Sequence, residues 1–129
     1  MIQKVKNLLA IAFLPLLLCQ CVTTEQATVK SPPITVQGTL FYPDEANQTY
    51  IVPAGAEIVG AGGNNCRYIV ENGGKLTAHS GTDNTYKIKQ GGFFKGFAHP
   101  ANNCRVQYQN GAQIEKVQGG SEVAFELTH

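Results

Sequence analysis

The amino-acid sequence predicts an all-β protein, and specifically a short parallel β-solenoid of about four to five coils. The first observation is a repeat, because the segments Gln48–Ile58, Cys66–Leu76, Asn84–Phe94 and Cys104–Ile114 share one pattern of polar, apolar and glycine positions. The second is a period of roughly 18–20 residues, which is visible in the glycines at one phase: Gly55, Gly73, Gly91 and Gly111. Such copies cannot bury an apolar face alone and must stack on one another.

Each copy is expected to form two short strands. The first strand alternates with period two and places aromatic and β-branched side chains inward, as a half-buried strand requires. These inward residues are Tyr50, Val52, Tyr68, Val70, Tyr86, Ile88, Val106 and Tyr108. The second strand follows the glycine and has the inward column Ile58, Leu76, Phe94 and Ile114.

The turn between the two strands contains glycine, which adopts the positive backbone angle that bulkier residues resist. Asn-Gly between alternating runs also predicts a hairpin, so an antiparallel β-hairpin meander is the alternative fold. We prefer parallel stacking because like residues recur at the same phase of each copy, and a parallel stack places them directly above one another. A meander has no reason to align them.

The segments on either side of the repeat fit the same scheme less regularly. Ile34 and Leu40 precede Val52 and Ile58 by one period of the repeat, so residues 33–42 are expected to form a first coil. The alternating residues Val123, Phe125 and Leu127 predict a final strand. Residues 34–129 are therefore expected to form one β-solenoid domain.

Residues 1–21 have the features of an export signal. Lys4 and Lys6 precede an uncharged, leucine-rich stretch that is too short to span a bilayer comfortably. Residues 18–21 resemble the lipobox of bacterial lipoproteins, which implies lipid attachment at Cys21, although Gln20 stands where that box has a small residue. Ordinary cleavage after Cys21 is the alternative. The polar residues 22–33 are expected to form a flexible tether.

Export restricts the location and the partners of the mature chain. A lipidated chain would be attached to the outer membrane or cell surface, and an unlipidated chain would be periplasmic or secreted. Without Lys4 and Lys6, eight basic residues face nine acidic ones, so no basic patch predicts binding to nucleic acid. No later apolar run approaches the length that a membrane-spanning helix needs, so any membrane attachment is expected at the N-terminus.

Two cysteines remain in the mature chain, Cys66 and Cys104, and a secreted protein would usually join such a pair. The repeat argues against a disulfide, because Asn84 occupies the same position in the copy between them. Two rungs of about 4.8 Å separate their backbones by about 9.6 Å. A disulfide needs Cα atoms within about 7 Å. The sequence leaves the disulfide open.

Two histidines recur at one phase, since His79 lies five residues before Asn84 and His99 five before Cys104. They are expected to share a column on adjacent coils, where imidazoles suit zinc or copper. Solvated histidines in Gly, Ser, Pro and Asn-rich loops are the preferred explanation of the pair, so no cofactor is predicted. A second candidate site is the aromatic region of Phe93, Phe97 and His99, which could bind a glycan or a partner, or could instead fold over the core.

The most regular polar feature is the column of corner residues Asn47, Asn65, Asp83 and Asn103. Asn and Asp side chains bond to backbone at turns and stack as a ladder, which explains the column without a ligand. A calcium site is the alternative, although one carboxylate among amides is a poor cage for a divalent cation. No nucleophile elbow, phosphate loop or zinc-protease motif occurs, so we expect no enzymatic activity.

Residues 47–120 resemble the small, glycine-rich β-solenoid domains of bacterial surface and envelope proteins. The resemblance implies a rigid display or spacer module and assigns no catalytic residue. We therefore expect a non-enzymatic envelope protein that binds an envelope protein or glycan, or associates with its own copies through its end coils. The alternative is a glycan- or metal-binding module at the Phe93, Phe97 and His99 region.

Overall fold

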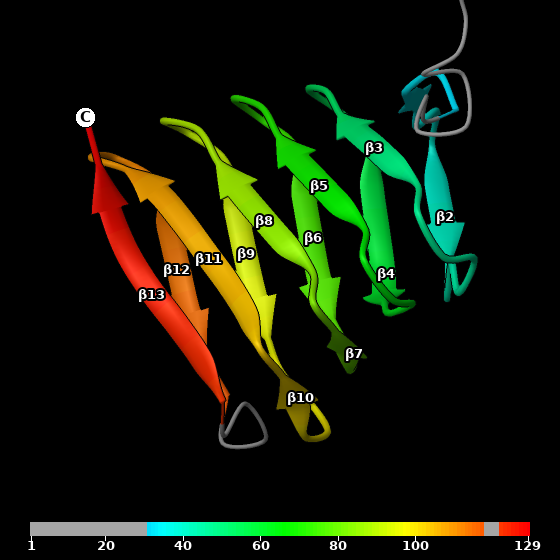
Figure 1. Cartoon of the computed structure of the whole chain (residues 1–129). Helices are drawn as coiled ribbons and strands as arrows, with labels where there is room; N and C mark the ends of the chain where they lie inside the picture. The colour runs from blue at the N-terminus through cyan, green and yellow to red at the C-terminus, as the bar shows by residue number, and fades with distance from the viewer. Residues whose placement is uncertain (1–30, 118–121) are drawn as a thin grey trace, which may run out of the picture. The chain divides into compact units, whose positions relative to one another are not determined.

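A computed structural model describes residues 31–117 and 122–129, which form an all-β unit of parallel strands (Figure 1). Six strands form one parallel sheet, called sheet A here: β1 (Ile34–Thr35), β3 (Thr49–Val52), β5 (Arg67–Val70), β8 (Thr85–Ile88), β11 (Cys104–Gln109) and β13 (Val123–Thr128). Five form sheet B: β2 (Thr39–Phe41), β4 (Glu57–Ala61), β6 (Lys75–Ala78), β9 (Phe93–Gly96) and β12 (Gln113–Lys116). The short strands β7 (Gly81–Thr82) and β10 (Ala101–Asn102) pair with each other.

Apart from β7 and β10, successive strands of the chain alternate between sheets A and B, so the backbone winds as a β-solenoid of about five turns. All pairings between these strands are parallel, which confirms the predicted solenoid and excludes the hairpin meander for the described residues. The register follows the repeat, because Tyr68 pairs with Tyr50 on one side and with Tyr86 on the other.

The core lies between sheets A and B and is built of stacked columns. Tyr50, Tyr68 and Tyr86 are buried, and their rings stack with centroids 5.2 and 4.9 Å apart and planes within 10° of parallel. The predicted inward residues of both strands are buried, except that Tyr108 and Ile114 near the C-terminal end are partly buried. Each fully buried apolar side chain contributes about 1.5–3 kcal/mol, so the stacked columns supply most of the stability.

The repeat glycines form the turns between the two sheets, as predicted. Gly55, Gly73, Gly91 and Gly111 all have positive φ, between 82° and 94°. Each of the first three donates its N–H to the carbonyl of the next glycine along the stack, at 3.2, 3.0 and 3.2 Å in turn. The hydrogen-bonded ladder therefore continues through the turns, although the four glycines are exposed there.

The first coil differs from the prediction in its register. Leu40 pairs with Ile58 as expected, but Ile34 pairs with Tyr50 and not at the level of Val52. The turn between β1 and β2 is shorter than the corresponding turn of the next coil, so the offset between the two coils is smaller in sheet A than in sheet B. As a result Val36 takes the buried position, and Ile34 is exposed.

The last strand, β13, pairs with β11 over its whole length, which confirms the predicted strand at Val123, Phe125 and Leu127. Phe125 lies in register with Val106 and packs against the core, whereas Leu127 is 51% exposed. The predicted export signal, Cys21 and most of the predicted tether lie outside the described residues. The described part of the chain includes no helix that is long and apolar enough to cross a bilayer.

Candidate functional site

The corner column is the most regular polar feature of the structure. Asn47, Asn65, Asp83 and Asn103 all have φ between 53° and 63°, a left-handed conformation that Asn and Asp tolerate better than other side chains. Asn65 Nδ2 donates to Asn47 Oδ1 at 2.8 Å, and Asn103 Nδ2 donates to Asp83 Oδ1 at 2.7 Å. These two bonds give the predicted ladder as two separate pairs, and the corner conformation explains why the residues recur.

The column extends further than the sequence pattern indicated. Cys104 pairs with Val123, and its N–H donates to the Glu122 carbonyl at 3.2 Å, so Glu122 follows Asn103 at the corner. Two carboxylates, Asp83 and Glu122, thus stand two rungs apart, at about 9.6 Å along the stack. Glu122 differs from the other corner residues in type and in its spacing from the preceding corner, so the repeat alone did not identify this position.

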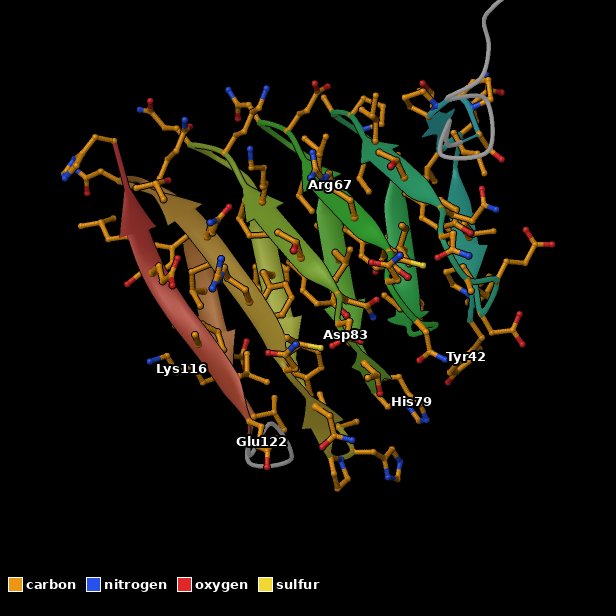
Figure 2. The ribbon with its side chains drawn as sticks, viewed as in Figure 1. Tyr42, Arg67, His79, Asp83, Lys116 and Glu122 are labelled. Carbon is orange, nitrogen blue, oxygen red and sulfur yellow. The ribbon has the colours of Figure 1, made fainter. Side chains whose placement is uncertain are left out.

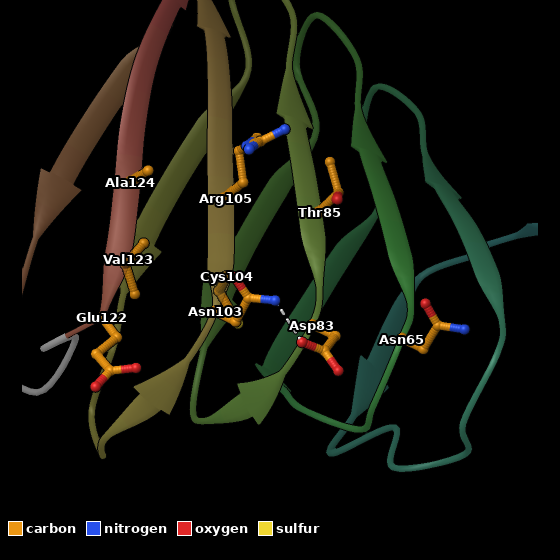
Figure 3. A pocket seen from close by; sticks show the side chains of 9 residues that line it. All are labelled: Asn65, Asp83, Thr85, Asn103, Cys104, Arg105, Glu122, Val123 and Ala124. Atoms are coloured by element: carbon orange, nitrogen blue, oxygen red, sulfur yellow. Dashed lines mark hydrogen bonds between the residues drawn. The ribbon is translucent and has the colours of Figure 1, made fainter.

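An open groove of about 630 Å³ lies beside this part of the column (Figure 3). Its residues come from the corners and from the outer face of sheet A: Asn65, Asp83, Thr85, Asn103, Cys104, Arg105, Glu122, Val123 and Ala124. The Arg105 guanidinium already contacts a carboxylate outside the groove, with Nε 3.5 Å from Glu126 Oε2. The groove therefore offers amides, carboxylates and a hydroxyl for hydrogen bonding.

Cys66 and Cys104 are buried and free, so the structure does not join the two thiols. The Cys66 Sγ lies 3.0 Å from the Glu45 carbonyl oxygen, and the Cys104 Sγ lies 3.7 Å from that of Gly81. Burial raises the pKa of the Cys104 thiol, which disfavours a reactive thiolate there. The parallel register agrees with the argument that two rungs separate the pair too widely for a disulfide.

Between the two cysteines lies Asn84, whose side chain is buried and forms a hydrogen-bonding centre that was not predicted from the sequence. Its Oδ1 accepts the Cys66 N–H at 2.8 Å. Its Nδ2 donates to the carbonyl oxygens of Gly63 and Gly62, at 3.1 and 3.3 Å, and to the Tyr86 hydroxyl, at 3.3 Å. The sequence did contain a signal for this role, because the copies before and after Asn84 have cysteine, Cys66 and Cys104, at the same position.

The proposed aromatic surface of Phe93, Phe97 and His99 does not exist as one patch. Phe97 is fully buried and packs edge-on against Phe94 and Tyr86, with ring centroids 5.7 and 5.4 Å apart. The ligand-patch alternative is therefore wrong for Phe97, and the other alternative holds: the loop after β9 closes over the core and removes the ring from water. Phe93 is partly exposed in β9, in register with Lys75.

His79 and His99 lie together as predicted. The His99 N–H donates to the His79 carbonyl at 2.8 Å, and the two ring centroids are 4.4 Å apart. Tyr42 contacts the His79 ring edge-on, with centroids 5.7 Å apart. In residues 31–117 and 122–129, no group of three or more His, Cys, Asp or Glu side chains gathers closely enough to hold a metal ion.

The chain was also compared with known proteins. No protein-family model matches it, and no curated protein or solved structure matches it either. The assignment of a function therefore depends on the residues and geometry described above.

Proposed function

We propose that this chain is a non-enzymatic, exported cell-envelope protein whose β-solenoid serves as a structural or protein-interaction module, and that further copies associate with it through the end coils. The observation that supports this proposal most directly is the pair of unfinished solenoid ends. In residues 31–117 and 122–129, the walls of the solenoid close on a packed core, whereas its ends present strand edges and apolar side chains. Strand edges are templates for pairing with another chain.

At the C-terminal end, β12 and β13 are the last described strands of sheets B and A. Sheet A has one strand more than sheet B, so part of the inner face of β13 has no described strand opposite it. Leu127 is 51% exposed there, and Val117 is 36% exposed. The Lys116 ammonium lies 4.6 Å from the centroid of the Phe125 ring and covers only that part of the end.

At the N-terminal end, β1 and β2 are the first described strands of their sheets. Two large apolar side chains are exposed in this coil, Ile34 by 39% and Phe41 by 63%, whereas the exposed Tyr42 ring leans over Gly60 toward His79. Large exposed apolar side chains that cluster at one end are typical of contact surfaces.

A second copy of the chain is the partner that fits these ends best. Its terminal coils have the same strand spacing and the same two-sheet cross-section, so contact between ends would extend the hydrogen-bonded sheets and cover the exposed apolar side chains. An unrelated envelope protein would need a matching pair of edges.

Sedimentation velocity over a range of protein concentrations tests this proposal. We expect wild-type protein to associate as its concentration rises, and Leu127→Lys to weaken that association by placing a charge at the contact. Ile69→Lys is the matched control, because Ile69 lies in the middle of sheet A and its substitution leaves the ends intact. Wild-type protein that stays monomeric at all concentrations, or equal effects of both variants, would contradict self-association through the ends.

The exported state needs a separate measurement. Intact mass spectrometry of the protein from its native host distinguishes a chain that starts at an acylated Cys21 from one that starts at Val22. Either mass supports export. A chain that retains residues 1–21 and is recovered from the cytosolic fraction would contradict it.

A further inference from the structure

The histidine pair differs from the other stacked columns of the solenoid. The buried tyrosines stack flat, with planes 6° and 10° apart, as like residues on successive rungs are expected to do. The rings of His79 and His99 instead are tilted by 58°, although their centroids are only 4.4 Å apart. Simple stacking of like residues does not produce this geometry, and tilted rings can direct edge nitrogens toward a common point.

The pair is also accessible and its backbone is held. His79 follows β6 and is partly exposed, while His99 follows β9 and is exposed. The 2.8 Å bond from the His99 N–H to the His79 carbonyl extends the pairing of β6 with β9 to the histidines themselves. Solvent therefore reaches both imidazoles, and the spacing between their backbones is set by the sheet.

A third ring, that of Tyr42, also contacts His79. Tyr42, two coils earlier, extends across Gly60 of the intervening coil to meet the His79 ring edge-on; both rings are labelled in Figure 2. A Cβ atom at Gly60 would overlap the Tyr42 ring, so the absence of a side chain at Gly60 allows this contact. Tyr42 and His99 together limit the orientations of the His79 imidazole, and such preorganisation favours binding of a ligand.

We propose that His79 and His99 bind one divalent late transition-metal ion, with Cu²⁺ bound most tightly and water completing its coordination. Neutral imidazole is a common ligand of copper, nickel and zinc, and the affinity of such sites rises to a maximum at Cu²⁺. Mg²⁺ and Ca²⁺ prefer oxygen ligands and are not expected to compete. Because the protein supplies two ligands, the ion remains open to exchange with ligands in solution.

Isothermal titration calorimetry of the full chain with Cu²⁺ measures the stoichiometry and affinity of binding and so tests the site. We expect one ion per chain, and affinity lower on the order of tenfold or more in His79→Gln and in His99→Gln, because either change converts a chelate into a single ligand. His129→Gln is the matched control, since it removes the remaining histidine of the chain from a position at the C-terminus. The nitrogen splitting in the electron paramagnetic resonance spectrum should indicate two imidazoles in wild type and one in each variant.

Glutamine keeps a polar side chain of similar length, and circular dichroism checks that each variant folds. A variant that does not fold is replaced by the corresponding Asn substitution. Unchanged Cu²⁺ affinity in both pair variants would place the ion at a terminus or a thiol and would overturn the proposal. So would a loss of affinity in His129→Gln, or failure of the wild-type chain to bind Cu²⁺ more tightly than Mg²⁺. None of these outcomes depends on self-association through the end coils.

Discussion

Replacing Asn84 with alanine should strongly destabilise the solenoid, because this side chain satisfies buried groups in two coils. In the described part of the chain, Asn84 is the hydrogen-bond partner of the Cys66 N–H and of the Tyr86 hydroxyl. The carbonyls of Gly62 and Gly63 keep other donors, from the Tyr68 hydroxyl at 2.6 Å and the Thr82 N–H at 3.2 Å. Truncation therefore leaves two buried polar groups without their partner, and not four.

The cost follows from this count. A buried donor or acceptor that loses its partner costs about 1–3 kcal/mol, so the two groups together lower the free energy of unfolding by about 2–6 kcal/mol. Small domains have a total stability of about 5–15 kcal/mol, so the variant would lose a large part of it. Urea unfolding followed by circular dichroism measures the difference.

Asn102→Ala is the matched control, since Asn102 is exposed in β10 and exposed substitutions change stability by less than about 0.5 kcal/mol. A loss in Asn84→Ala that equals the control would refute the assignment of Asn84 as the partner of these two groups.

Asn84→Asp separates the accepting from the donating role of this side chain. The carboxylate can still accept the Cys66 N–H, but it places a buried charge beside the Gly62 and Gly63 carbonyls. Burial should raise the carboxyl pKa above its unfolded value of about 3.9. The folded variant then binds the proton more tightly than the unfolded chain, so its stability relative to wild type should improve as the pH falls from 7 to 4. A pH-independent difference would contradict this argument.

Two further predictions concern the tyrosine stack and a turn glycine. Burial raises the pKa values of Tyr68 and Tyr86 well above 10, whereas unfolded tyrosine ionises near pH 10. The free energy of unfolding should therefore fall above pH 10 by about 1.4 kcal/mol per pH unit for each tyrosine, and Tyr86→Phe should reduce the slope in urea melts at pH 8–11. A Cβ atom at Gly74 would overlap the Val52 carbonyl oxygen, so Gly74→Ala should cost about 1–3 kcal/mol in the same assay. Gly62→Ala, where the nearest atom is 3.8 Å away, should cost little; equal losses in the two variants would contradict the steric argument.

The repeat predicted the parts of the fold in which one column of side chains determines the next. Tyr50, Tyr68 and Tyr86 lie in register because each coil uses the same turn length, and this is visible as a constant spacing. The spacing predicted the wrong partner for Ile34. The shorter turn between β1 and β2 reduces the offset between the first two coils in sheet A, whereas the offset in sheet B is unchanged. Sequence spacing measures a whole coil and does not locate an insertion or deletion within it.

The candidate sites were less predictable because they depend on how side chains turn after a strand ends. Phe97 follows the last residue of β9, where period-two alternation no longer indicates a direction, and the structure buries it. His79 and His99 were paired correctly because their offsets from the next strand are equal. The contact of Tyr42 with His79 was not predictable from the repeat. The Tyr42 ring reaches His79 only because Gly60, in the coil between them, has no side chain.

A one-dimensional stack also explains why the two proposals concern different parts of the molecule. Each inner coil contacts only its neighbours, so its core positions are occupied by residues that match the coils above and below. Terminal coils lack one neighbour, and Leu127 is exposed for that reason. The edge loops lie outside the columns, so His79 and His99 can be substituted without opening the core. Association should therefore respond to changes at the ends and metal binding to changes at the edge, and each measurement serves as a control for the other.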